Sequence, residues 1–191
     1  MNGEWCYFKS YFTKEECEKI LADGLKLPPE ESTVGTDNGV QTNLSIRKSK
    51  VRFIQRDDPT FEWLFDKIWK IGLQANSDWF NFHTTKLSFI QLAEYDSKDE
   101  GEYKRHHDVF WINNDPYYHR KLTCVIQLTN PLEYDGGNFE IWSEKDKPSA
   151  HDIRQQGSAI FIPSFLEHQA TPVTKGKRYS LAVWFEGPKW R

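Results

Sequence analysis

The sequence predicts a mainly β domain of the α+β class, in which short strands form a jelly roll and N-terminal helices pack on one of its faces. Helical periodicity is confined to residues 1–83, and from residue 84 onward short alternating or apolar runs are separated by turn residues. A length of 191 residues fits one domain. We therefore expect a single domain, with a helical support section over 1–83 and a jelly-roll core over 84–191.

A first helix is predicted close to the N-terminus. Thr13 and Glu16 can form a capping box, in which the Thr13 hydroxyl accepts from the Glu16 amide and the Glu16 carboxylate accepts from the Thr13 amide. Apolar residues at three- and four-residue spacing continue the helix to about Leu25, and a pair of prolines then ends it. The polar residues 29–43 are expected to form a loop or lid.

A strand and a second helix complete the N-terminal section. Residues Ile46–Gln55 are predicted to form the strand. Asp58 can then cap a helix whose first position is Pro59, where a missing N–H costs nothing. The apolar face of this helix fades near Gly72, so we expect the helix to end there.

The second half of the chain is predicted to consist of short strands. Asparagine, glycine and proline separate the apolar runs. The expected strands span residues 87–92, 104–110, 122–128, 138–142, 158–162 and 179–185. Such a series behind a helical section is typical of a β-sandwich or a jelly roll.

Composition and charge limit the function classes. With a net charge of -3, the chain lacks the positive field that attracts phosphate backbones, which argues against nucleic acid as a partner. The three cysteines stand far apart without a CxxC pair, which favours a reducing compartment and argues against a cysteine zinc site. No apolar stretch approaches the roughly 18 residues of a membrane span, and the N-terminus does not resemble a signal peptide. The expected location is therefore cytoplasmic, with no membrane partner.

Three residues form a candidate metal site. His106 and Asp108 stand two apart in a predicted strand, so their side chains leave on one face while His107 points to the other. An imidazole and a carboxylate supply two ligands of the facial triad that suits non-haem Fe(II). An H-x-D pair alone arises readily by chance, so a third ligand is needed. His168 fits that role because it follows an apolar strand, although a register slip of one residue would make His107 the rival ligand.

A candidate anion site follows in the last predicted strand. Arg178 and Ser180 share one face of that strand, ten residues after His168. A guanidinium fork and a hydroxyl on one face can converge on a single carboxylate.

As an ordered set, these motifs resemble the Fe(II)/2-oxoglutarate-dependent oxygenase superfamily, and within it the prolyl-4-hydroxylase-like group of double-stranded β-helix enzymes. The segment from Gly101 to Asp108 resembles the strand with the first two iron ligands, and Asp135-Gly136-Gly137 resembles the family's Gly-Gly turn. The stretch 161–180 resembles the segment with the distal histidine and the arginine that binds 2-oxoglutarate. The resemblance covers the C-terminal half well and the N-terminal helices only loosely.

The resemblance implies a double-stranded β-helix fold and a role for each matching residue. His106, Asp108 and His168 would bind iron. Arg178, helped by Ser180, would pair with the C5 carboxylate of 2-oxoglutarate. Relatives acting on collagen-like chains usually carry lysine in place of the arginine, which argues against a collagen-type substrate.

Two further residues match the co-substrate pocket. Tyr95 matches a tyrosine that lines it, and Gln127 falls where some relatives place a tyrosine in contact with the co-substrate, so the contribution of Gln127 stays open. The cofactors implied are Fe(II), 2-oxoglutarate and O2, with ascorbate as a candidate for rescuing oxidised iron.

The leading functional hypothesis is a dioxygenase that hydroxylates a C–H bond of a prolyl or similar residue in a peptide or protein and releases succinate and CO2. A second hypothesis is a hydroxylase of a free amino acid or another small molecule. An open channel across the metal would favour the peptide, and a closed pocket of roughly a few hundred Å³ would favour the metabolite. A third is a non-catalytic sensor that binds a metal or a diacid, against which the intact ligand set argues. The acidic balance argues against a fourth, repair of nucleic-acid bases. The sequence yields no expectation about oligomeric state.

Overall fold

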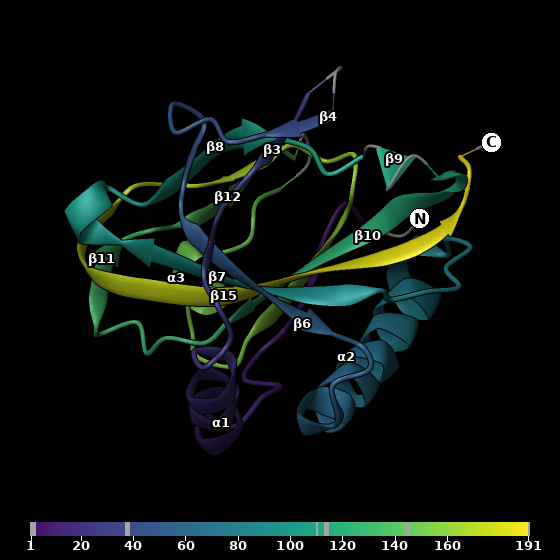
Figure 1. Ribbon diagram of the computed structural model, residues 1–191. Coiled ribbons are helices and arrows are strands. Elements are labelled where there is room, and N and C mark those ends of the chain that lie inside the picture. The colour runs from purple at the N-terminus through teal and green to yellow at the C-terminus, as the bar shows by residue number, and fades with distance from the viewer. Residues whose placement is uncertain (1–2, 37–38, 110, 113–114, 144–145, 191) are drawn as a thin grey trace.

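Two antiparallel sheets face each other across the interior of the protein, and the helices α1 and α2 cover the outer face of the larger sheet (Figure 1). The computed structural model describes residues 3–36, 39–109, 111–112, 115–143 and 146–190. The arrangement confirms the predicted jelly roll with N-terminal helices on one face.

The larger sheet is one of the two layers, and its strands all pair antiparallel within the described residues. From one edge to the other they are β1 (Cys6–Phe8), β13 (Ala159–Pro163), β10 (Asp115–Gln127), β15 (Val173–Pro188), β7 (Phe89–Asp96), β6 (Lys50–Gln55) and β2 (Glu30–Glu31). Two short strands extend it, β9 (Trp111–Ile112) beside β10 and β11 (Tyr134–Gly136) beside β15.

The smaller sheet faces the larger one and contains His106 and His168. Its order is β12 (Phe139–Ile141), β14 (His168–Ala170), β8 (Glu102–His106) and β5 (Arg47–Lys48). The register of β14 and β8 pairs His168 directly with His106, so two imidazoles far apart in sequence lie on neighbouring strands. A separate hairpin joins β3 (Val34–Thr36) and β4 (Gly39–Gln41) within the stretch expected to be a loop.

The first predicted helix is confirmed as α1 (Lys14–Gly24) with Thr13 as its cap. The Glu16 amide donates to Thr13 Oγ1 at 3.2 Å, and the Thr13 amide donates to Glu16 Oε2 at 2.8 Å. Both halves of the capping box are therefore present.

The second helix is longer than predicted. Asp58 caps a short 3₁₀ turn over Pro59–Phe61, α2 follows over Glu62–Ala75, and a π-helical turn continues it to residue 80. The expected end near Gly72 is wrong because this glycine serves packing: an added Cβ would lie 2.1 Å from the Phe185 ring. The remaining helices are α3 (Ala150–Ile153) and a 3₁₀ turn at Ser97–Asp99. Within the described part of the chain, none of the helices combines the length and hydrophobicity needed to cross a bilayer.

The long strand β15 separates the core from the interior pocket. The core lies between the larger sheet and the helices, where α1 and α2 residues pack against side chains of β7, β10 and β15. The β15 residues that enter this core are Leu181, Val183 and Phe185. Those that line the pocket on the opposite face are Arg178, Ser180, Ala182 and Trp184.

Candidate metal centre

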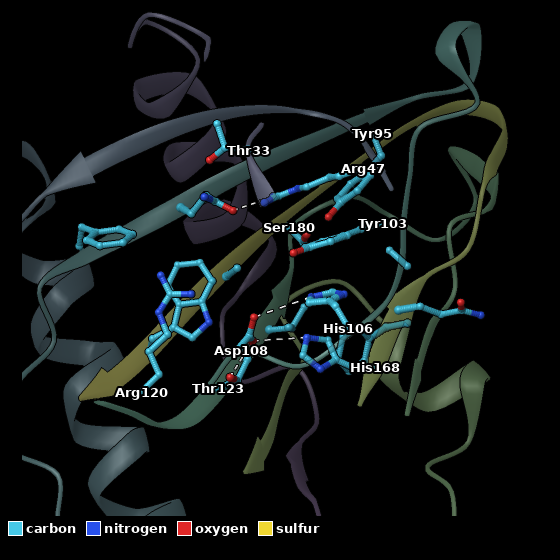
Figure 2. Close-up of a pocket in the computed structure, with 18 of the residues that line it drawn as sticks. Thr33, Arg47, Tyr95, Tyr103, His106, Asp108, Arg120, Thr123, His168 and Ser180 are labelled. Atoms are coloured by element: carbon cyan, nitrogen blue, oxygen red, sulfur yellow. Dashed lines mark hydrogen bonds and ion pairs between the residues drawn. The ribbon is translucent and has the colours of Figure 1, made fainter. Parts of the chain in front are cut away.

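The structure brings His106, Asp108 and His168 together in the wall of one pocket (Figure 2). Their ligand atoms all lie within 4.8 Å of one another. His106 is the last residue of β8 and His168 the first residue of β14. His107 is exposed, so the predicted assignment of the two neighbouring histidines agrees with the structure.

Asp108 reaches the site from outside the predicted strand. β8 ends at His106, and the Asp108 amide donates to the Ser164 carbonyl oxygen at 2.8 Å. The turn after β13 therefore anchors the backbone that carries the carboxylate. The structure brings the two residues of the i, i+2 pair together although the strand ends earlier than expected.

Backbone carbonyls orient both imidazoles. His106 Nδ1 lies 2.7 Å from the Lys104 carbonyl oxygen, and His168 Nδ1 lies 2.9 Å from the Leu166 carbonyl oxygen. A carbonyl oxygen only accepts, so each Nδ1 carries a proton, and each Nε2 is the nitrogen left to face the site. The His106 Nε2 lies 3.7 Å from Asp108 Oδ1 and the His168 Nε2 lies 3.4 Å from Asp108 Oδ2. Both Nε2 atoms thus face the carboxylate, as ligands of one ion would.

One hydroxyl group holds the carboxylate in place, and a second hydroxyl contacts the first. Thr123 Oγ1 donates to Asp108 Oδ2 at 2.8 Å, and it lies 3.0 Å from Ser164 Oγ. Thr123 and Ser164 are both buried, so neither hydroxyl readily exchanges its partner for water. The Asp108 side chain is fixed from β10 as well as from the turn after β13.

Burial and mutual contact set the protonation of the three side chains. Burial lowers the pKa of His106 to about 3, with the neighbouring His168 adding to the effect. Burial alone would raise the pKa of Asp108, but His168 and His106 hold it far below its usual value. Burial would lower the pKa of His168, whereas Asp108 raises it by more. His106 is therefore neutral and Asp108 charged at physiological pH, which are the forms that bind a metal.

A buried guanidinium lies farther along the same pocket. Arg178 is 1% exposed, and its Nε donates to Gln127 Oε1 at 3.1 Å. Its Nη2 is buried without a hydrogen-bond partner within the described residues. Tyr95 pairs with Arg178 across β7 and β15, with its ring 5.2 Å from the guanidinium carbon, and Ser180 lines the same wall. A buried cation with an orphaned donor is chemically suited to an anion such as a carboxylate.

The predicted Gly-Gly turn packs against this arginine. Gly136 and Gly137 have φ of 71° and 59°, in the left-handed region that side chains disfavour. An added Cβ on Gly137 would lie 3.0 Å from Arg178 Cδ. The second glycine therefore leaves room for the arginine stem.

The pocket continues from Arg178 past the three ligands to an aromatic end, with a volume of about 430 Å³. Sequence reasoning did not single out several of its lining residues: Arg47, Tyr103 and Arg120. Trp184 is a further lining residue: its side chain is buried, and the Arg120 guanidinium carbon lies 3.7 Å from the centre of its ring. Strand alternation would have found Trp184, six residues after Arg178 on the same face.

Arg120 faces the pocket because of a β-bulge. The register of β10 against β15 shifts between Arg120 and Leu122, which inserts Lys121 as an extra residue. Without the bulge, Arg120 would share the core-facing side of β10 with Leu122. No simple sequence pattern marks a bulge here, so periodicity alone could not have placed this side chain.

Comparison with known proteins adds three findings. A protein-family model described as "2OG-Fe(II) oxygenase superfamily" matches residues 90–186, slightly more than half of the chain. A PKHD-type hydroxylase of Aliarcobacter butzleri is 31% identical over 139 residues, which cover 70% of this chain and 58% of the relative. A PKHD-type hydroxylase of Nitrosomonas europaea is 34% identical over 71 residues, which cover 37% of this chain and 30% of the relative. The chain therefore spans less than two thirds of the length of these relatives.

Solved structures show the same fold. The crystal structure of a Pseudomonas putida prolyl-4-hydroxylase is similar with a TM-score of 0.69 and 16% identity, covering 99% of this chain and 94% of that protein. A prolyl hydroxylase from Trichoplax adhaerens, in complex with a peptide fragment of the hypoxia inducible factor oxygen degradation domain, has a TM-score of 0.74 and 18% identity, covering 96% and 83%. At these identities the similarity establishes the architecture and leaves the substrate open.

Proposed function

Because this chain belongs to the 2OG-Fe(II) oxygenase superfamily, we propose that it is an Fe(II)- and 2-oxoglutarate-dependent dioxygenase that hydroxylates a C–H bond. The substrate that we propose is a prolyl or similar residue in a peptide or protein. The observation that carries this proposal is the convergence of His106, Asp108, His168 and the buried Arg178 on one pocket. Family membership implies Fe(II), 2-oxoglutarate and O2 as cofactor and co-substrates.

The residues fit the metal in number and in kind. Two imidazoles and one carboxylate, those of His106, His168 and Asp108, make the ligand set of the facial triad, which leaves positions open for co-substrate and O2. When bound, iron and 2-oxoglutarate supply the oxidising chemistry, in which one oxygen atom enters the substrate C–H bond and the other enters succinate as CO2 leaves. The Nδ1 contacts to Lys104 and Leu166 keep both Nε2 atoms aimed at a common point.

The task of Arg178 in this proposal is to hold the distal carboxylate of 2-oxoglutarate. Its Nη2 supplies the orphaned donor, and Ser180 supplies a hydroxyl on the same wall. Gln127 Oε1 accepts from Arg178 Nε and so fixes the plane of the guanidinium group. This contact supports an indirect part for Gln127, as the residue that orients the arginine, while Tyr95 packs against the guanidinium face.

The substrate would approach from the aromatic end of the pocket. Phe53, Phe89 and Trp184 line that end and offer apolar surface for an aliphatic ring such as that of proline. The fold similarity to a prolyl hydroxylase in complex with a peptide supports a peptide substrate. A free amino acid is the second candidate, which the pocket volume of about 430 Å³ favours.

Anaerobic titration tests the cofactor assignment. Adding Fe(II) and then 2-oxoglutarate should produce a weak visible charge-transfer band, because the co-substrate would bind directly to the metal. His106→Ala and Asp108→Ala should abolish the band, whereas His107→Ala, at the exposed neighbour, should retain it. A band of unchanged intensity in His106→Ala and Asp108→Ala would reject the assignment.

Succinate formation tests the substrate class. Proline-containing peptides and free amino acids should be compared at equal concentration, with the uncoupled rate without substrate as the baseline. Stimulation by peptides would support the leading proposal, and stimulation by free amino acids alone would support the second candidate.

A further inference from the structure

The pocket holds more positive than negative charge, although the chain as a whole carries a net charge of -3. Three guanidinium groups line it, those of Arg47, Arg120 and Arg178. Among the described residues that line it, Asp108 is the sole carboxylate. A pocket of this kind selects ligands of negative charge.

Two of the three guanidinium groups have a negative charge to interact with, from the proposed co-substrate or from acidic residues of the protein. Arg178 faces the distal carboxylate in the function proposed above. Arg120 lies opposite Glu186 in the register of β10 and β15, and Glu186 is a buried residue whose carboxylate accepts from Ser88 Oγ at 2.5 Å. Burial lowers the pKa of Arg120 to about 10, and the negative charges of Asp108 and Glu186 oppose that shift.

Arg47 differs from the other two. It is 6% exposed, its Nε donates to Ser49 Oγ at 3.0 Å, and its Nη2 donates to Gln91 Oε1 at 2.7 Å. Both acceptors are neutral, and no ion pair among the described residues includes Arg47. Since a guanidinium stays charged at any physiological pH, this is a buried cation held in place without a counter-ion.

The position of Arg47 relates it to the metal site. Its guanidinium carbon lies 4.5 Å from the centre of the Tyr103 ring, and that ring stacks on His106 with 3.4 Å between centroids. Figure 2 shows Arg47 on one side of Tyr103 and His106 on the other. The Tyr103 ring therefore lies between the Arg47 guanidinium and the His106 imidazole. A single small substrate is long enough to reach from Arg47 to the metal site.

We propose that Arg47 binds a carboxylate of the substrate, close to the C–H bond that is hydroxylated. The proposal rests on the function proposed above. The two positive charges of Fe(II) and the two negative charges of 2-oxoglutarate would cancel, so that binding both would still leave Arg47 without a counter-ion. A monoanion fits better than a phosphate, since Ser49 and Gln91 already occupy two of the guanidinium donors. The carboxylate belongs either to a free amino acid or to an acidic residue or C-terminus of a peptide.

The first experiment needs neither metal nor turnover. In metal-free protein with ¹⁵N-labelled arginine, the Nε–H resonance of Arg47, identified by its loss in Arg47→Gln, should shift saturably on titration with acetate at constant ionic strength. Lys48→Gln is the matched control, because Lys48 is the next residue but pairs with Glu100 outside the pocket. A linear, unsaturated shift of the Arg47 resonance would overturn the proposal, even if the oxygenase assignment stands.

The second experiment uses the iron-loaded enzyme and separates the two sources of the carboxylate. Substrates are compared as pairs that differ only in charge: free L-proline with L-prolinamide, and a blocked peptide with glutamate beside proline with its glutamine counterpart. The acidic member of at least one pair should be preferred, and Arg47→Gln should raise its KM about 10- to 100-fold while Lys48→Gln does not. Equal turnover of the acidic and neutral members of both pairs would overturn the proposal. Absence of an iron and 2-oxoglutarate band would instead count against the proposed function.

Discussion

Single hydrogen bonds decide where each ligand of the candidate metal centre points. The carbonyl oxygens of Lys104 and Leu166 fix the two imidazoles, and the Thr123 hydroxyl fixes the carboxylate of Asp108. None of these partners would touch the metal. They act by holding the ligands ready, which lowers the entropy cost of assembling the site when iron binds.

Thr123→Val should weaken metal binding without unfolding the protein. Valine keeps the shape of threonine but cannot donate to Asp108 Oδ2, so the carboxylate loses one of its two anchors. We expect the dissociation constant for Mn(II), followed by the electron paramagnetic resonance of the free ion, to rise about 10- to 100-fold. Thr123→Ser is the control and should bind nearly as the wild type does. Wild-type affinity in Thr123→Val would show that Ser164 and the backbone suffice.

At the residue scale, the sequence predicted the side chains whose spacing is local. His106, Asp108, Arg178 and Ser180 lie in short motifs, and their strand or near-strand setting places all four in the lining of one pocket. Thr123 carries no such signal, because its partner is distant in sequence and any threonine in a buried strand looks alike. Its role required coordinates.

The helix α2 stays against the sheet because one of its residues has no side chain. Gly72 faces the Phe185 ring of β15, which is buried in the core shared with the helices. In an isolated helix, alanine in place of glycine would be stabilising by roughly 1 kcal/mol. Here the helix preference and the packing act in opposite directions.

Gly72→Ala should destabilise the protein, since the added Cβ would lie 2.1 Å from atoms of the Phe185 ring, which is packed in the core. Overpacking of a core costs about 1–3 kcal/mol and should exceed the gain in helix propensity. Urea unfolding at constant pH gives the free energy of unfolding. Leu73→Ala is the neighbouring control, because Leu73 is 45% exposed and should change the stability by no more than about 0.5 kcal/mol. A Gly72→Ala variant more stable than wild type would show that the ring yields.

At the element scale, prediction succeeded where a terminus carries its own signal and failed where packing decides. The capping box at Thr13 fixed the start of α1, whereas the glycine taken for the end of α2 proved to be a packing residue. The strand β14 and the hairpin of β3 and β4 were not predicted, since three residues are too few to show alternation. Such strands exist because a neighbouring strand supplies their hydrogen bonds.

A charged cluster ties the N-terminal section to the long C-terminal strand. Glu94 on β7 accepts from Arg52 on β6 at 2.9 Å and from Lys177 on β15 at 2.8 Å, and Lys177 also pairs with Asp96. Burial alone would raise the pKa of Glu94, but the hydrogen bonds from Lys177 and Arg52 hold it below its ordinary value of 4.5. The ionised carboxylate is therefore favoured by the folded state.

The stability that Glu94 provides should depend on pH. With its pKa depressed on folding, the contribution is fully present above the ordinary value of 4.5 and is lost as the pH falls through the lower folded value. Glu94→Gln should cost about 1–3 kcal/mol at pH 7, and its difference from wild type in urea unfolding should shrink in acid. Glu18→Gln, at an exposed ion pair with Lys14, should show no such trend. If the difference in unfolding free energy between Glu94→Gln and wild type is the same in acid as at pH 7, the substitution has removed packing and not charge.

For the whole molecule, the sequence predicted the layers but not how the first section joins them. The helices were expected to support the jelly roll, and they do, yet residues before position 84 also supply β1 and β6 to the larger sheet and β5 to the smaller one. Through β5 this section places Arg47 in the pocket, a residue that the resemblance to the oxygenases did not reach. Pairing between distant segments leaves little trace in either segment alone.

The alternation along β15 limits how this protein can change by mutation. Point substitutions can alter one wall of the strand at a time, but a deletion or insertion of one residue between Arg178 and Phe185 would exchange the two walls beyond it. Leu181, Val183 or Phe185 would then face the pocket, and Trp184 would face the core beneath the helices. Length within this strand is therefore fixed far more tightly than the identity of most of its residues, and loop ends are where new segments can be accepted.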